Sequence, residues 1–156
     1  MHRPADRTSL RTTFDSAAER YDRARPPYPG AIFDDLAASA RLGPGSRVLE
    51  IGAGTALATV PLAERGCDIV AIELGAEVAA IAARRLAAFP SAQVIISSFE
   101  DWPLPGEPFD AVVSATAFHW IDPRIRVAKA AAALRAGGML AIIETRRVAA
   151  SLRSSR

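Results

Sequence analysis

The chain has 156 residues, of which 50% are hydrophobic and 23% are charged, and its formal net charge is +2. This length allows one domain with a proper hydrophobic core and is too short for two comfortable ones. The basic residues are almost all arginine and are scattered along the chain, so the charge gives no support for binding to nucleic acid or to an anionic membrane.

Cysteine and histidine are scarce in this sequence. Cys67 is the only cysteine, which excludes an intrachain disulfide and a multi-cysteine metal site. The two histidines, His2 and His119, are too few and too far apart in the sequence to indicate a metal centre. Residues 1–13 are polar and arginine-rich, and no apolar run has the length of a membrane span. We therefore expect a cytoplasmic protein.

The first 30 residues are predicted to form a segment outside the main sheet. An amphipathic stretch covers about 14–21, and an extended, proline-rich run follows at 25–29. A helix is then predicted over 32–40, because its apolar residues fall on one helical face. A Gly-Pro-Gly turn signal at 43–45 precedes the first predicted strand.

The rest of the chain alternates between short apolar runs and longer alanine-rich patterns. Strands are predicted at 47–51, 68–72, 93–97, 110–114 and 139–144, with helices at 57–65, 76–88 and 124–134. Continuous apolar strands favour a parallel sheet with helices on both faces, and strict alternation favours right-handed crossovers. We predict an α/β fold: a Rossmann-like, doubly wound, mostly parallel sheet of about five strands. It occupies a domain over 31–145, and a disordered or frame-shifted tail follows at 146–156.

The ends of the predicted strands carry the candidate site, because ligands of open parallel sheets bind beyond the carboxyl ends of the strands. Gly52 and Gly54 follow the first strand and let the backbone turn tightly against a ligand. Glu73 ends the second strand, 19 residues after Gly54, where a carboxylate can accept hydrogen bonds from both ribose hydroxyls. Phe99, after the third strand, offers an apolar wall for a purine. Together these features predict a nucleoside site.

Two residues distinguish between the possible nucleosides. A dinucleotide fold needs a small residue at the third position of its glycine motif, where this chain has Leu57. Glu50 lies two residues before Gly52 and would repel a pyrophosphate, whereas it would favour the ammonium group of S-adenosylmethionine. The sequence therefore favours S-adenosylmethionine over NAD.

The motifs resemble those of class I S-adenosylmethionine-dependent methyltransferases. Residues 48–55 (VLEIGAGT) look like the first motif of that family, and Glu73 matches its ribose-binding acid. Residues 98–102 resemble its adenine-contacting segment, and residues 109–114 and 117–120 resemble its fourth-strand motif. Phe14, Tyr21-Asp22 and residues 25–29 are similar to a subgroup that methylates small molecules and in which the leading segment closes over the cofactor. The resemblance runs from about residue 14 to 144.

The resemblance implies S-adenosyl-L-methionine as cofactor and a small-molecule methyl acceptor as partner, with no nucleic acid and no membrane. The predicted cofactor-binding residues are Glu50, Gly52, Ala53, Gly54, Glu73, Leu74, Ser98, Phe99, Glu100 and Ser114. The predicted substrate-facing residues are Tyr21, Arg25, His119 and Trp120. We identify no catalytic residue beyond the weak candidate His119, because methyl transfer from a sulfonium needs positioning more than covalent help.

Several of these residues have an alternative structural interpretation. Glu50 could cap the following helix, Phe99 could belong to the core, and Glu100 could be a surface residue. For His119 we favour a loop position beside Trp120 over the role of general base. Tyr21 and Arg25 could reach the carboxylate of the cofactor or lie on the surface.

Two departures from the family pattern are visible. Ala56 stands where the family usually has a third glycine, and we expect this mild change to crowd the methionine end of the cofactor without excluding it. The sequence after the fifth strand lacks the family's C-terminal β-hairpin, which leaves that strand as an edge that can self-associate. Three functions stay open: an active methyltransferase, a truncated and inactive remnant, and a non-catalytic nucleotide-binding or interaction module.

Overall fold

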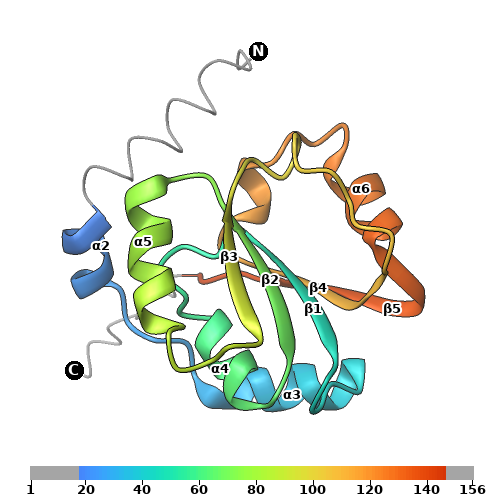
Figure 1. Cartoon of the computed structure of the whole chain (residues 1–156), viewed down its shortest axis with the longest axis horizontal. Coiled ribbons are helices and arrows are strands. Elements are labelled where there is room, and N and C mark those ends of the chain that lie inside the picture. The colour runs from blue at the N-terminus through green and yellow to red at the C-terminus, as the bar shows by residue number, and fades with distance from the viewer. Residues whose placement is uncertain (1–17, 147–156) are drawn as a thin grey trace, which may run out of the picture.

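The computed structural model describes residues 18–146, and it places five strands in one sheet. The strands are β1 (Arg47–Ile51), β2 (Asp68–Glu73), β3 (Ala92–Ile96), β4 (Phe109–Ala115) and β5 (Leu134–Ile143). All neighbouring pairs are parallel, in the order β3-β2-β1-β4-β5 (Figure 1). The predicted α/β sheet is therefore confirmed. Its strand order changes direction between β1 and β4, which is where sheets of this kind bind ligands.

Helices cover both faces of this sheet. They are α2 (Ala18–Ala24), α3 (Gly30–Ala40), α4 (Thr59–Glu64), α5 (Ala76–Arg85) and α6 (Arg126–Ala133), with a 3-10 turn η2 (Phe118–Trp120). The helices α3 and α4 pack on one face and α6 packs on the other (Figure 1). No helix in residues 18–146 is long and apolar enough to cross a membrane.

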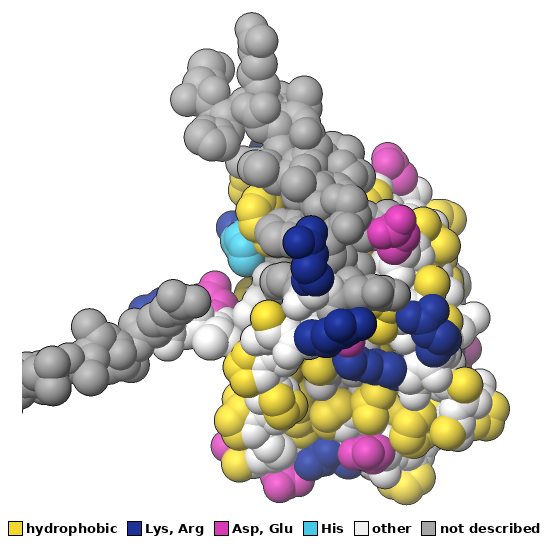
Figure 2. Space-filling view, turned by 90° about the vertical axis from the view of Figure 1, so that its left-hand side faces the viewer, with side chains coloured by type: hydrophobic (Ala, Val, Ile, Leu, Met, Phe, Trp, Pro, Cys, Tyr) yellow, Lys and Arg dark blue, Asp and Glu magenta, His cyan; other side chains and the backbone are white. Residues whose placement is uncertain are grey.

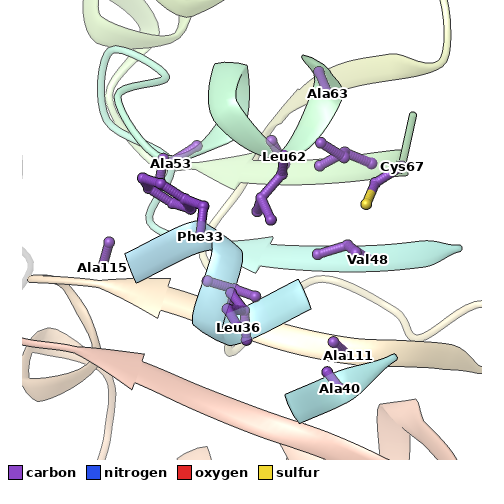
Figure 3. Close-up of a cluster of buried hydrophobic side chains, with 14 residues drawn as sticks. Phe33, Leu36, Ala40, Val48, Ala53, Leu62, Ala63, Cys67, Ala111 and Ala115 are labelled. Carbon is purple, nitrogen blue, oxygen red and sulfur yellow. The ribbon is translucent and has the colours of Figure 1, made fainter. Parts of the chain in front are cut away.

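The packing of the core explains why the strands appear in the sequence as continuous apolar runs. Phe33 and Leu36 of α3 pack with Leu62 of α4 against Val48 on one face of β1 (Figure 3). Leu49, the next residue of β1, belongs to the cluster on the opposite face. Because successive side chains of a strand point to opposite faces, a strand buried on both sides needs an apolar residue at every position.

Element boundaries differ from the prediction most strongly at β5. This strand begins at Leu134, directly after α6, and not at residue 139. Its pairing with β4 is irregular between Phe109 and Ala111, and Gly137 in the irregular part has a φ of +77°. Asp110 anchors this region by accepting hydrogen bonds from Arg135 Nε (2.6 Å) and from the Arg47 amide (2.8 Å). These two hydrogen bonds lower the pKa of the Asp110 carboxyl group.

Three predictions concern the N-terminal segment, the C-terminal tail and the exposed edge of β5. Within the segment, α2 packs beside α5 through an ion pair of 2.6 Å between Asp22 and Arg85. Residues 1–17, including Phe14, and residues 147–156 of the predicted tail lie outside the described residues. β5 is an edge strand of the described sheet, and self-association through it stays a prediction.

Replacing Phe33 with alanine is expected to lower the free energy of unfolding by about 3–5 kcal/mol, because the buried ring fills the space between α3 and the sheet. Equilibrium unfolding in urea measures this loss. The control variant Asp35→Ala changes an exposed residue of the same helix and is expected to stay within about 0.5 kcal/mol of the parent. Equal stability of the two variants would contradict the described packing.

Candidate functional site

A pocket lies at the carboxyl ends of β1, β2 and β4. It encloses about 840 Å³ of space that opens to solvent. Its lining brings together the predicted site residues Arg25, Gly52, Gly54, Glu73, Leu74, Phe99 and Trp120. Apolar residues at the strand ends, such as Ile51, Ile72 and Ala115, complete much of the wall. An apolar pocket with a few convergent polar groups is the usual form of a small-molecule or cofactor site.

Gly52 forms the tight turn after β1. Its φ is +71°, and its amide donates to the Ile72 carbonyl at the end of β2 (2.9 Å). A Cβ atom at this position would lie 2.4 Å from the Cβ of Ala117, in the loop after β4. Glycine is therefore required here both for its backbone conformation and for the close approach of two loops. Gly54 also has a positive φ, +57°, but no atom lies within 4 Å of the place its Cβ would occupy.

Glu73 holds the turn from the opposite side. Its carboxylate accepts the Gly54 amide at 2.7 Å and the Gly75 amide at 3.0 Å. A carboxylate has about four acceptor positions, so these two bonds leave capacity for further donors in the pocket. Glu73 is half-buried at the pocket edge, which suits a group that orients hydroxyl donors of a ligand.

Glu50 is buried and takes a different environment from Glu73. Its side chain is 1% exposed and accepts a hydrogen bond from the Thr59 hydroxyl group. Burial raises the pKa of Glu50 to about 8, and the nearby charge of Glu73 adds to this shift while the bond from Thr59 opposes it. Glu50 lines a smaller cavity together with Arg25, beside the main pocket. Glu50 thus contacts the first residue of α4 through the Thr59 side chain, but α4 has no side-chain cap hydrogen bond. With a pKa of about 8, the carboxyl group of Glu50 is largely protonated at neutral pH.

The aromatic residues of the site lie at its wall and mouth. Phe99 is 1% exposed and belongs to the core cluster on the α6 face while also lining the pocket, so both interpretations of its position hold. Trp120 of η2 lines the pocket and is half-buried. His119 is exposed and does not line the pocket, and its ring centroid lies 4.8 Å from that of Trp120.

Five predicted cofactor-binding residues, including Glu50, do not line the main pocket. Ser114 is buried and donates to the Ile51 carbonyl (2.9 Å), which ties β4 to β1. Ser98 donates to Asp101 (2.8 Å), and Glu100 accepts the Asp122 amide (3.0 Å). Ala53 is buried and lines the smaller cavity together with Glu50. The side chain of Tyr21 lies outside what the structure describes.

Thr116 and Tyr28 are site residues that the sequence analysis did not single out. The Arg25 guanidinium donates to both of their hydroxyl groups, which also share a hydrogen bond of 3.0 Å. Thr116 lines the pocket directly after β4 and has a φ of +53°, an unfavourable conformation for a β-branched residue. Such strain gathers at functional sites. The position of Thr116 at a strand end was the signal that could have identified it.

Ala56 lies away from the pocket. It is fully buried, its φ is +73°, and it clusters with Ala82 and Leu86 beside α5. Its methyl group therefore packs in a hydrophobic cluster and lines neither the main pocket nor the smaller cavity, and the expected effect on a bound cofactor stays a prediction. Within residues 18–146, no group of three or more His, Cys, Asp or Glu side chains could hold a metal ion.

Comparison with known proteins gives consistent matches. The sequence model of a family described as "Methyltransferase domain" matches residues 49–142. An uncharacterized methyltransferase of Mycobacterium tuberculosis is 36% identical over 137 residues, which cover 88% of this chain and 54% of that protein. The chain thus spans about half the length of the curated relatives it matches first.

Solved structures share the fold. The complex of DhpI with SAM and HEP matches with a TM-score of 0.70 and 23% identity, covering 96% of this chain and 70% of that one. A SAM-dependent methyltransferase of Geobacter sulfurreducens in complex with S-adenosyl-L-homocysteine matches with a TM-score of 0.64 and 18% identity, covering 82% and 53%.

Alanine at Gly52 and at Gly54 is expected to have unequal effects. Gly54→Ala should cost about 1 kcal/mol of unfolding free energy, because only its left-handed backbone conformation is strained. Gly52→Ala should cost more, since its new methyl group also collides with Ala117 and separates the β1 and β4 loops. Urea unfolding of the two variants checks this, and equal costs would contradict the close approach at Gly52.

Glu50 is expected to make stability fall as the pH rises. Between its ordinary pKa of 4.5 and its folded pKa of about 8, the folded chain binds a proton that the unfolded chain releases. The free energy of unfolding therefore decreases by about 1.4 kcal/mol per pH unit in this window from Glu50 alone. Glu50→Gln cannot titrate, so its stability relative to the parent should increase by about 2–3 kcal/mol from pH 5.5 to pH 8. A difference that stays constant with pH would show that Glu50 is ionised in the folded chain.

Proposed function

The chain belongs to the methyltransferase domain family, and from this premise we propose that it uses S-adenosylmethionine to methylate a small-molecule acceptor. The proposal rests on one observation. Four predicted cofactor-binding residues line the same pocket at the strand ends: Gly52, Gly54, Glu73 and Phe99. The chain spans about half the length of its relatives, so the activity of a whole relative enters here only as part of the proposal.

The residues of the pocket fit this cofactor. We place the ribose beside Gly54, where its hydroxyl groups would donate to the remaining acceptor positions of Glu73. Phe99 would form the wall against the purine. Glu50 and Arg25 meet at the smaller cavity, where a carboxyl group and a guanidinium suit the ammonium and carboxylate of an amino acid. A bound ammonium would favour the ionised form of Glu50.

The chemistry that we propose for the chain itself is positioning. S-adenosylmethionine, when bound, supplies a methyl group already activated by a sulfonium. The protein then has to align an acceptor with that methyl group and exclude competing water. Thr116, Ala117 and Trp120 line the part of the pocket contributed by the β4 loop, and we propose that the acceptor enters there. His119 is exposed and its ring lies against Trp120 at an interplanar angle of 43°, which supports a role in shaping the entrance over that of a base.

A small acceptor agrees with the lining and charge of the site. The pocket wall is mainly apolar and carries a few polar groups such as Glu73, Arg25 and Thr116, which is the usual form of a small-molecule site. The face that carries α2 and α5 mixes basic, acidic and hydrophobic side chains (Figure 2). A nucleic acid partner would instead favour a continuous basic surface.

Binding of S-adenosylhomocysteine to the purified full chain tests the proposal, measured by isothermal calorimetry. Glu73→Ala is expected to weaken binding by about 10- to 100-fold, because it removes charge-assisted hydrogen bonds to the ribose. Glu77→Ala is the matched control, since it removes an exposed glutamate from the first turn of α5 and should bind like the parent.

Three outcomes would count against the proposal. A folded parent chain that does not bind S-adenosylhomocysteine would overturn the assignment of the cofactor. Equal weakening in Glu73→Ala and Glu77→Ala would overturn the role of Glu73. Equally tight binding of adenosine nucleotides would favour a general nucleotide-binding module. A chain that binds is then tested for transfer of a labelled methyl group to a panel of small alcohols, amines and phenols.

A further inference from the structure

Lys129 connects α6 to the loop that forms one wall of the pocket. It is the only lysine in the chain and lies half-buried on α6. Its Nζ atom donates to the carbonyl oxygens of Glu100 (2.9 Å) and Trp102 (2.6 Å). The same atom lies 5.2 Å from the ring centroid of Phe99. One ammonium group therefore contacts three residues of the loop that follows β3.

These contacts suit the chemistry of lysine. An ammonium group has three donors and no acceptor, so it can satisfy two carbonyl groups at once. Hydrogen bonds with a charged donor are shorter and stronger than neutral ones, and a cation above an aromatic face is attracted by it. A neutral side chain at this position would leave both carbonyl groups without these donors.

The loop held by Lys129 carries Phe99, the pocket residue that we assign to the purine. A second bond fixes the loop from another side, where the Asp122 amide donates to the Glu100 carboxylate at 3.0 Å. The backbone of the loop itself is closed by a bond from the Trp102 amide to the Ser98 carbonyl (3.1 Å). Lys129 adds these polar contacts to the apolar packing of α6, whose Ala130 and Ala133 share a buried cluster with Phe99.

We propose that Lys129 is a positioning residue for the base-binding wall of the pocket. It does not contact the ligand; it acts through the loop 98–102 and the Phe99 ring. This inference rests on the proposed function, because it assigns the Phe99 wall to the purine of the cofactor. Its consequence is that loss of Lys129 weakens binding of the adenosine end without a separate effect on the amino-acid end.

Two ligands separate the two ends of the site. S-adenosylhomocysteine occupies both ends, whereas 5′-methylthioadenosine lacks the amino-acid part. Lys129→Met, which has a similar length but no charge, is expected to weaken binding of both ligands by the same factor, about tenfold or more, as is typical when a supporting partner is removed. Lys129→Arg keeps the charge and donors and should recover part of the loss. Arg84→Met removes an exposed cation from α5 and should bind both ligands like the parent.

A spectroscopic measurement reports on the contact without any ligand. Lysine labelled with carbon-13 at Cε gives a single side-chain NMR signal, because the chain has one lysine. The ring of Phe99 should shift this signal from its free value, and Phe99→Leu should remove the shift. Binding of S-adenosylhomocysteine against Phe99 should move the signal again in the parent chain.

The outcomes separate the inference from the proposed function. A folded parent that binds neither ligand would overturn the proposed function, and the inference with it. A parent that binds while Lys129→Met binds equally well would overturn the inference alone. A Lys129→Met variant with a lower melting temperature but unchanged affinities would assign Lys129 to stability only, which also contradicts the inference. Equal weakening for both ligands, with partial recovery in Lys129→Arg, would support it.

Discussion

The close approach of the β1 and β4 loops at Gly52 is the contact on which the pocket depends. The amide of Gly52 is bonded to the end of β2, and the missing Cβ leaves room for Ala117 after β4. Ser114 ties the same two strands with a buried hydrogen bond to the Ile51 carbonyl. The turn after β1 therefore fixes the carboxyl ends of β1, β2 and β4 relative to one another. Glu73 and Thr116 take their positions in the pocket from this junction.

The two glutamates of neighbouring strands show how burial divides the roles of identical side chains. Glu73 is half-buried at the pocket edge and accepts hydrogen bonds from two backbone amides. Glu50 is buried with a pKa of about 8, so burial stores a proton on it at neutral pH. A cationic ligand group beside Glu50 would compensate the cost of ionising it. The main pocket thus offers a glutamate with free acceptor positions, and the smaller cavity beside it offers one whose charge would depend on the ligand.

The sequence was sufficient to predict the sheet, because burial on both faces leaves a continuous apolar run. β1 spans the predicted residues 47–51, and the positive φ of Gly52 and Gly54 agrees with their predicted turn. The early start of β5 could not be predicted, since it depends on pairing with β4 and on the Asp110–Arg135 contact. Thr116 and Lys129 escaped prediction for a similar reason. Their partners lie far away in the sequence, and neither residue stands in a motif that identifies its contact.

Different elements hold the two sides of the pocket. On the base side, Lys129 links the Phe99 loop to α6, whose alanines are buried in the core. On the other side, Arg25 reaches Thr116 from the N-terminal segment, and that segment is tied to α5 by the Asp22–Arg85 ion pair. The Arg85 side chain is 36% exposed, whereas Asp22 is 14% exposed. Arg85 also donates to the Thr55 carbonyl (3.0 Å), so it joins the segment to the turn after β1. The two walls of the pocket are therefore fixed by different parts of the fold. A cofactor that contacted both walls would couple the docking of this segment to its own binding.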